Sequence, residues 1–389
     1  MATESQEAAA LETRLRFFLG GGHDSFEELA LAVFQHQARV VPAYRGLLAG
    51  RGLDPGSVRD WREIPPVPVR AFRSLPLVSG GEAGAARAQA TFRTSGTTGG
   101  EGARGRHSVL DLSLYRASVV PNAARHLNPR GQPLRVIGLV PQPADRPDSS
   151  LAAMTEILAE AWDPAGGHFV ADAGWRLDLA RLGQAIEDAR GAGLPVLLIG
   201  TAFAFVHVLD EGLPGRRQSG PGKGTGPASG AKASRWLLPP GSVVVETGGF
   251  KGRSRTVGRA ELYRGIAGRF GLPIGRIVNE YGMTEMLSQF WERAAIEDEP
   301  ATPGERTLHG PPWVRTRVLD PETLAPQEEG TPGLLAHLDL ANLHSVSALL
   351  TEDLGIAEGE GFRLLGRRPG AEPRGCSLVM EELFGGHGG

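Results

Sequence analysis

The sequence predicts an α/β fold with a largely parallel sheet and a β-rich C-terminal subdomain. Continuous apolar runs typical of buried strands, at residues 134–140 and 195–200, alternate with amphipathic stretches of helical period, such as residues 151–161 and 177–192. This alternation is typical of parallel strands joined by helices. After residue 300 the pattern changes to strand-like segments, the first at residues 314–319.

Local signals predict the remaining elements. Residues 26–34 have helical periodicity with Ser25 placed to cap the helix, whereas the prolines of residues 64–69 require an extended chain. Further helices are expected at residues 111–126, 260–270 and 377–384, and further strands at residues 241–246, 277–278, 333–338 and 362–368.

The chain divides into three predicted regions. Residues 1–90 form a helical N-terminal region, residues 91–300 an α/β core, and residues 301–389 the β-rich subdomain with a hinge-like tail. Residues 211–235 are rich in Gly, Ser, Pro and basic residues, a composition that cannot support a packed core, so a flexible surface insertion is expected there. Lys223 in this insertion superficially suggests a nucleoside-triphosphate loop, but glycine follows it and neither a strand nor a helix flanks it.

Composition argues against several classes of partner and compartment. The 389 residues carry a formal net charge of -3, with 41% hydrophobic and 22% charged residues, so nucleic acid or an anionic membrane surface is not expected as a partner. One cysteine cannot form an internal disulfide, and no apolar stretch reaches the roughly 18 residues of a membrane helix. The first residues lack the basic and apolar regions of a signal peptide. We therefore expect a cytoplasmic protein without membrane insertion.

A glycine- and hydroxyl-rich loop follows Phe92. Glycines let the backbone turn tightly, so that successive N–H groups can point at one phosphate oxygen, and hydroxyls add uncharged donors. A flexible glycine loop is the alternative, because the chain contains 55 glycines. The candidate phosphate-binding residues are Thr94, Ser95, Gly96, Thr97, Thr98 and Gly99.

An aromatic, hydroxyl and carboxylate cluster lies far downstream, at Tyr281, Gly282, Met283, Thr284 and Glu285. Its tyrosine ring can stack on a purine, and its threonine can donate a hydrogen bond to an α-phosphate. Its glutamate is a hard oxygen ligand suited to Mg²⁺. Ordinary capping at the start of a helix is the alternative role for the threonine and the glutamate.

The loop and the cluster together resemble the phosphate loop and nucleotide motif of the adenylate-forming superfamily, which includes acyl-CoA synthetases, peptide-synthetase adenylation domains and luciferase. More narrowly, four segments resemble the acyl-protein synthetases of bacterial bioluminescence: residues 199–207, 246–255, 278–285 and 374–377. The resemblance spans roughly residues 15–385. It implies the N-terminal domain architecture of that superfamily, ATP and Mg²⁺ as cofactors, a fatty acid as substrate, and an acyl-reductase as partner.

The resemblance also implies roles for single residues. It places Gly248 and Gly249 beside the adenine and Asp353 on the ribose hydroxyls. Arg367 matches an arginine that contacts the ribose and marks a hinge. A turn role for Asp353 and a solvated strand end for Arg367 are the alternatives.

One departure from the superfamily concerns charge on the α-phosphate. Most members continue into a mobile lid with a catalytic lysine, whereas here only a short tail without lysine follows Cys376. Lys251 is the only lysine within an ordered-looking motif, so it is the candidate to take over that role. A surface position after a glycine turn is its alternative.

Cys376 is the candidate acyl carrier. A thiolate is a good nucleophile toward an acyl adenylate, and the thioester keeps much of the activation. Arg367, Arg368 and Arg374 lie close in sequence, and positive charge favours the thiolate. The alternative is a buried cysteine that acts as a small hydrophobic residue.

These features predict a long-chain fatty-acid–protein ligase. It would activate a fatty acid as acyl-AMP, transfer the acyl group to the cysteine, and deliver it to the reductase. An acyl-CoA or aryl-CoA ligase like the phenylacetate ligases is the first alternative, and a non-catalytic nucleotide-binding subunit is the second.

Overall fold

The structure is a computed structural model of the whole chain. It describes residues 2–94, 104–211, 236–248, 257–297, 300–367, 379–380 and 383. The predicted insertion, from residue 212 on, and most of the predicted helix at residues 377–384 lie outside these ranges.

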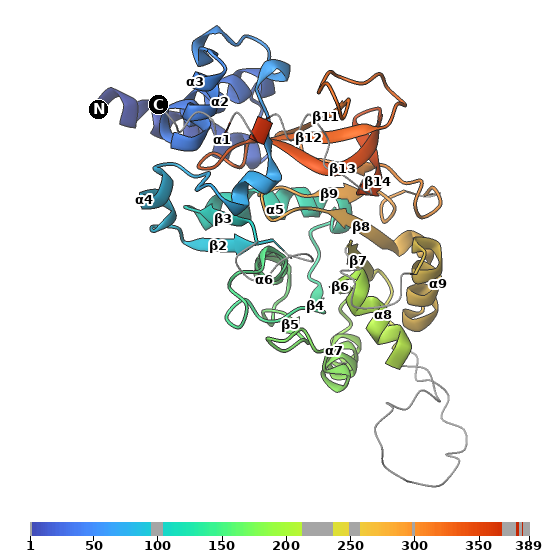
Figure 1. The fold of residues 1–389 in the computed structure, drawn as a ribbon. Helices are drawn as coiled ribbons and strands as arrows, with labels where there is room; N and C mark the ends of the chain where they lie inside the picture. Colours follow the sequence, from blue (N-terminus) through green and yellow to red (C-terminus); the bar gives the residue numbers. More distant parts are fainter. Residues whose placement is uncertain are drawn as a thin grey trace, which may run out of the picture.

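Helices begin the chain, as predicted: α1 (Ala2–Leu19), α2 (Phe26–Val40) and α3 (Pro42–Gly50), at the upper left of Figure 1. Ser25 caps α2, since its hydroxyl accepts a hydrogen bond from the Glu28 N–H at 3.3 Å. The proline-rich connector contains a short strand, β1 (Val67–Pro68), and a short helix, α4 (Gly81–Ala85), follows.

A hairpin and a long helix come next: β2 (Ala90–Arg93), β3 (Arg106–Val109) and α5 (Leu112–Leu127). The hairpin is antiparallel and forms a separate two-stranded sheet. The first strand confirms that Phe92 and the residues before it form the strand leading into the glycine-rich loop, whereas the returning strand was not predicted.

Strands and helices then alternate: β4 (Arg135–Gly138), α6 (Ser150–Trp162), β5 (His168–Phe169), α7 (Leu179–Gly191), β6 (Val196–Thr201), α8 (Ala202–Glu211), β7 (Val243–Thr247), α9 (Arg259–Phe270) and β8 (Ile277–Tyr281). The predicted alternation is confirmed, although β5 and α8 were not predicted. The five strands of this group pair in parallel.

Helices cover both faces of the parallel strands. On β6, Leu197 and Ile199 belong to the hydrophobic cluster shared with α5 and α6, whereas Val196 and Leu198 belong to the cluster shared with α7 and α9. All four side chains are fully buried. The continuous apolar run of this strand therefore has the cause expected of it, burial on two faces.

The chain ends in antiparallel strands: β9 (Phe290–Glu292), β10 (Leu308–His309), β11 (Val314–Leu319), β12 (Gly333–Asp339), β13 (Ala348–Glu358) and β14 (Gly361–Arg367). Twelve of the described strands form one sheet, in the order β11-β12-β13-β14-β10-β9-β8-β7-β6-β4-β5, with β1 beside β13. This sheet continues across residue 300, where the sequence predicts a boundary between regions.

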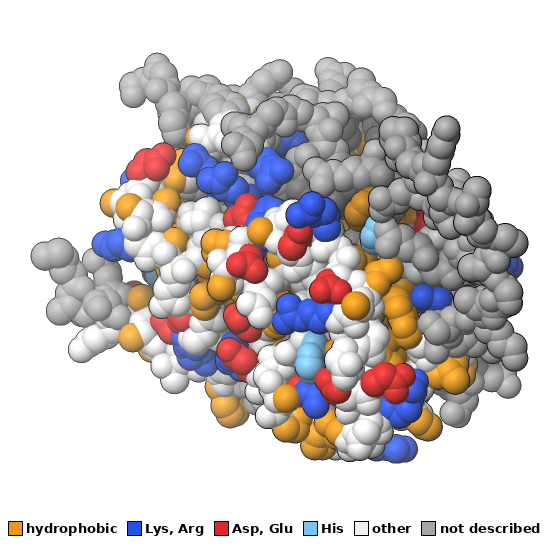
Figure 2. All heavy atoms as spheres, turned by 90° about the horizontal axis from the view of Figure 1, so that it is seen from below, with side chains coloured by type: hydrophobic (Ala, Val, Ile, Leu, Met, Phe, Trp, Pro, Cys, Tyr) orange, Lys and Arg blue, Asp and Glu red, His pale blue; other side chains and the backbone are white. Residues whose placement is uncertain are grey.

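The surface of the described residues is mixed in charge. On the face shown in Figure 2, basic and acidic side chains lie interspersed among apolar and uncharged ones. Among the described helices, none has both the length and the apolar character that crossing a membrane requires.

Candidate active site

Three predicted nucleotide-binding residues meet where β8 ends. The Tyr281 hydroxyl donates a hydrogen bond to Asp353 Oδ2 at 2.9 Å, and Arg367 Nε donates to Asp353 Oδ1 at 3.4 Å. Asp353 and Arg367 are paired across β13 and β14, so the sheet register itself brings the carboxylate and the guanidinium together. The Arg367 side chain is 68% exposed and that of Asp353 is 14% exposed, which leaves the guanidinium open to a ligand.

The Tyr281 ring packs mainly against the core. Its centroid lies 5.6 Å from that of Phe362, 5.7 Å from that of His337 and 5.9 Å from that of Phe290. The residue is only 8% exposed, so little of the ring is free for a base. Stacking on a purine therefore stays a prediction, while the hydroxyl has a clear function in orienting Asp353.

Two glycines border the tyrosine. Thr247 is opposite Glu280 in the parallel pairing of β7 and β8, so the exposed Gly248 leaves β7 beside Tyr281. A Cβ built on Gly248 meets no atom of the described residues within 4 Å. A Cβ on Gly282 would collide with the Glu280 carboxyl group, which explains glycine at that position.

Thr284 and Glu285 lie in an irregular turn between β8 and β9, and no helix begins there. Helix capping, the alternative role of these two residues, is therefore not supported. His107 Nδ1 lies 2.8 Å from the Thr284 carbonyl oxygen, and Asn342 Nδ2 donates to the Glu285 carbonyl at 2.8 Å. The partly buried Met283 packs against the core.

Asp339, at the end of β12, holds the next residues of the turn. Its fully buried carboxylate accepts hydrogen bonds from the N–H groups of Leu287 and Ser288, both at 3.0 Å, and from the Ser288 hydroxyl at 2.7 Å. The Ala341 N–H adds a fourth, at 3.0 Å. Burial raises the pKa of Asp339 to about 6, so the group is ionised at neutral pH and the four donors stabilise its charge.

The base of the predicted phosphate loop is closed by one residue pair. The Thr94 N–H donates to the Gly105 carbonyl at 3.0 Å, and the Gly105 N–H donates to the Thr94 hydroxyl at 2.9 Å. Thr94 thus uses its hydroxyl to fix the start of the loop. The other predicted loop residues lie outside the described residues: Ser95, Gly96, Thr97, Thr98 and Gly99.

Glu285, the predicted Mg²⁺ ligand, is 6% exposed. Burial raises its pKa to about 7. Within the described ranges, no group of three or more His, Cys, Asp or Glu side chains is arranged to hold a metal ion. A single carboxylate still fits Mg²⁺, because this ion usually takes one or two protein carboxylates and completes its shell with phosphate and water.

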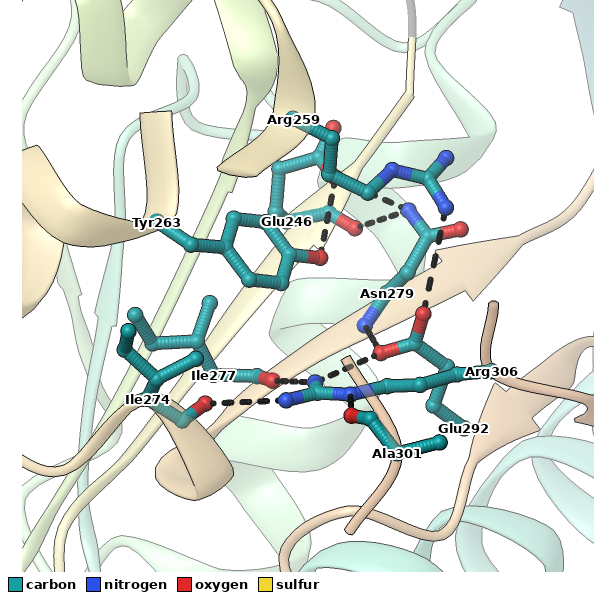
Figure 3. A network of polar contacts seen from close by, with 9 residues as sticks. All are labelled: Glu246, Arg259, Tyr263, Ile274, Ile277, Asn279, Glu292, Ala301 and Arg306. Carbon is teal, nitrogen blue, oxygen red and sulfur yellow. Dashed lines mark hydrogen bonds and ion pairs between the residues drawn. The ribbon is translucent and has the colours of Figure 1, made fainter. Parts of the chain in front are cut away.

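A buried polar network supports the ends of β7 and β8 from the face covered by α9 (Figure 3). Glu246 accepts hydrogen bonds from Asn279 Nδ2 at 2.9 Å and from the Tyr263 hydroxyl at 3.3 Å. The Asn279 N–H donates to Glu292 Oε2 at 3.0 Å. Burial raises the pKa of Glu246.

Arg306 neutralises the inner part of this network. Its guanidinium Nη1 lies 3.1 Å from Glu292 Oε2 and also donates to the Ile277 carbonyl at 2.7 Å. The Arg306 side chain is 4% exposed and that of Glu292 is fully buried. Arg259, at the start of α9, approaches the other Glu292 oxygen at 3.9 Å (Figure 3). The strand ends that carry Gly248 and Tyr281 therefore rest on a buried and largely paired set of charges.

Three further predicted site residues cannot be placed. Gly249, Lys251 and Cys376 lie outside the described residues, so their predicted roles remain predictions. Conversely, sequence reasoning missed His107, Asp339 and Asn342. The one available signal was polar: Asp339 and Asn342 interrupt a long apolar stretch, as buried polar residues with specific partners do.

Comparison with known proteins bears on this site. A family model described as "Acyl-protein synthetase, LuxE" matches residues 230–385, which include most of the residues above. Residues 230–385 are therefore similar in sequence to the acyl-protein synthetases. The family resemblance seen in the sequence is thereby confirmed for this part of the chain.

Two curated relatives match parts of the chain. A long-chain-fatty-acid–luciferin-component ligase of Aliivibrio fischeri is 28% identical over 152 residues, which cover 36% of this chain and 38% of the relative. The ligase of the same name from Vibrio harveyi is 35% identical over 85 residues, 19% of this chain and 21% of the relative. The matched segments thus span well under half the length of these relatives.

Solved structures confirm the fold. A 2-hydroxyisobutyryl-CoA ligase in the postadenylation state, in complex with 2-HIB-AMP, aligns with a TM-score of 0.55 and 13% identity, covering 88% of this chain and 67% of that one. The same ligase with 2-HIB-AMP and CoA aligns with the same TM-score and 14% identity, covering 88% and 68%. The predicted fold of an adenylate-forming enzyme is therefore correct.

The buried ion pair of Arg306 and Glu292 generates a stability prediction. Arg306→Met leaves the fully buried Glu292 charge without its nearest partner, so we expect a loss of about 3–5 kcal/mol in the free energy of unfolding. Urea unfolding followed by circular dichroism measures this loss. Arg363→Met is the matched control, because its pair with Glu358 at 2.8 Å is about one-third exposed and should contribute less than about 1 kcal/mol. Equal losses in the two variants would contradict the prediction.

Glu280 generates a prediction on pH. Burial, and secondarily the nearby Glu246, raises the pKa of Glu280 to about 8 from its usual 4.5. The folded protein therefore holds this proton at pH values where the unfolded chain has lost it, and stability falls as pH rises from about 4.5 to about 8.

Glu280→Gln removes this titration. Between pH 5 and pH 8, its free energy of unfolding should gain at least about 1 kcal/mol relative to the parent protein. Urea titrations at several pH values measure the gain. Glu297→Gln, at an exposed position, should follow the parent curve. A constant difference between the Glu280 variant and the parent across this range would refute the raised pKa.

Proposed function

We propose that the protein activates a long-chain fatty acid with ATP and then carries the acyl group as a thioester on Cys376 for delivery to an acyl-reductase. The observation that carries the proposal is the contact of Asp353 with both Tyr281 and Arg367, at the sheet edge where ligands of open α/β folds bind. The match of residues 230–385 to the acyl-protein synthetase family supports the same reading.

The nucleotide would lie along this edge. The Asp353 carboxylate would accept hydrogen bonds from the ribose hydroxyls, and the exposed Arg367 guanidinium would contact the same sugar. Gly248 has no side chain and meets no described residue above its backbone, which suits the close approach of a flat base. Thr284 and the loop that begins at Thr94 would hold the phosphates.

In the first step, a carboxylate oxygen of the fatty acid attacks the α-phosphorus of ATP. The bond from that phosphorus to the β-phosphate oxygen breaks, and pyrophosphate leaves with its electron pair. The chain contributes mainly positioning and donors toward the phosphate oxygens, with Thr284 and Lys251 as the candidates. Glu285 would hold Mg²⁺, which neutralises phosphate charge when bound.

In the second step, the acyl group passes to sulfur. Cys376 gives its proton to solvent, favoured by the arginines nearby in sequence, and the thiolate attacks the carbonyl carbon. The carbon–oxygen bond to AMP breaks and AMP leaves. A thioester at this position could then be passed on to the reductase.

The substrate class and the partner rest on relatives. Both curated relatives are named as ligases of a long-chain fatty acid, which suggests the substrate class. The resemblance of residues 374–377 to acyl-protein synthetases suggests the reductase as partner. Both inferences extend from matched segments that cover less than half of those relatives.

The ribose contact can be tested with Asp353→Asn. The substitution replaces a charged acceptor by a neutral amide, so we expect the KM for ATP in fatty-acid-dependent ATP–pyrophosphate exchange to rise at least about tenfold. Glu328→Gln, an exposed carboxylate on the connection between β11 and β12, is the matched control and should keep the parent KM. An unchanged KM in the Asp353 variant would remove this residue from the nucleotide site.

The acyl-carrier step can be tested with Cys376→Ser. Acid-dependent pyrophosphate exchange should persist, because adenylation does not need the sulfur, whereas labelling of the protein by radioactive fatty acid should fall to background. In the parent protein the label should be released by neutral hydroxylamine and should not require CoA. Loss of pyrophosphate exchange with retained labelling would show that the role assigned to Cys376 is wrong.

A further inference from the structure

His107 lies on β3, the returning strand of the hairpin that carries the predicted phosphate loop. It is 1% exposed, and its Nδ1 lies 2.8 Å from the Thr284 carbonyl oxygen. A carbonyl oxygen can only accept, so Nδ1 carries the proton and donates it. The two residues are 177 positions apart in sequence: Thr284 belongs to the predicted nucleotide motif, and His107 belongs to the hairpin that carries the predicted phosphate loop.

We propose that His107 is a positioning residue for ATP activation, which sets the backbone of Thr284 relative to the phosphate loop. The inference rests on the proposed function and goes beyond it, because His107 is not among the residues proposed to bind the substrates and acts through the backbone of Thr284. It names one hydrogen bond that joins the two phosphate-binding segments.

The hairpin can transmit this constraint. Phe92 is opposite His107 and Arg93 is opposite Arg106, and the next pair, Thr94 and Gly105, closes the base of the loop. His107 is therefore two residue pairs from the point where the loop opens. A shift of the ring would move the base of the loop against Thr284, and small misplacements at a reacting group lower rates strongly.

The ring also has an ordinary packing role, from which the proposal must be separated. It makes an edge contact with the Phe72 ring, with centroids 5.7 Å apart. Burial lowers the pKa of His107 to about 4, so the ring is neutral near pH 7 and offers Thr284 an uncharged donor. The packing contact with Phe72 requires only the volume of the ring. Positioning of Thr284 requires an N–H donor at the position of Nδ1.

Two substitutions separate volume from donor. His107→Leu keeps apolar volume but removes the donor, and His107→Asn loses volume but places an amide N–H where Nδ1 was. We expect kcat/KM for ATP in fatty-acid-dependent pyrophosphate exchange to fall at least about tenfold in the leucine variant. The asparagine variant should remain within about threefold of the parent, although its unfolding midpoint falls.

Further variants control for burial and for folding. His126→Asn changes another buried histidine, 5% exposed and at the end of α5, and should lower stability without altering the exchange constants. His107→Gln moves the donor one bond further out. If the leucine variant does not fold, the glutamine variant replaces it and should be at least about tenfold slower than the asparagine variant.

The outcomes separate this inference from the proposed function. If the parent protein exchanges pyrophosphate and His107→Leu keeps the parent constants, the inference is wrong. Equal impairment of the leucine and asparagine variants would reduce His107 to packing and would also overturn it. If the parent protein shows no pyrophosphate exchange with any of the fatty acids offered, the proposed function fails. The affinity of the same variants for Mg·ATP, measured by calorimetry, then tests the inference, and equal affinities refute it.

Discussion

The turn after Tyr281 must satisfy buried backbone groups without a regular ladder. Residues 284–288 are buried or partly buried yet belong to neither helix nor strand, so side chains must take over their hydrogen bonds. His107, Asn342 and Asp339 supply these partners from elements distant in sequence. The shape of the predicted nucleotide segment thus depends on buried side chains from distant elements, and Asp339 makes the most contacts because its charge is held by four donors.

A second constraint lies beneath the strand ends. Glu246 and Glu292 are buried on the face covered by α9, where an unpaired charge costs several kcal/mol. Arg306 compensates the charge of Glu292 and also donates to the Ile277 carbonyl. Asn279 and Tyr263 donate hydrogen bonds to Glu246. The same set of contacts therefore offsets the burial cost and fixes how far β7 and β8 extend toward the site.

The alternation of strands and helices could be predicted because each parallel strand is apolar on both faces, as β6 is. β13 was not predicted although it is 11 residues long, because the polar residues Thr351, Glu352 and Asp353 interrupt its apolar pattern. Tyr281, Asp353 and Arg367 were predicted as site residues through motifs, and the structure places them in contact. His107 was not, because its value lies in a contact across 177 residues that no local pattern records. The roles of Cys376 and Lys251 rest on sequence alone.

The unbroken sheet has a consequence for how the chain can be divided. β9 and β10 pair with each other although they lie on opposite sides of residue 300. The hydrogen bond from Tyr281 to Asp353 also joins residues on opposite sides of residue 300. A fragment ending at residue 300 would carry an open ladder edge, a surface that invites pairing with other chains, and a tyrosine hydroxyl without its carboxylate. Neither half is an autonomous module, so shuffling this region between proteins would have to exchange both segments at once.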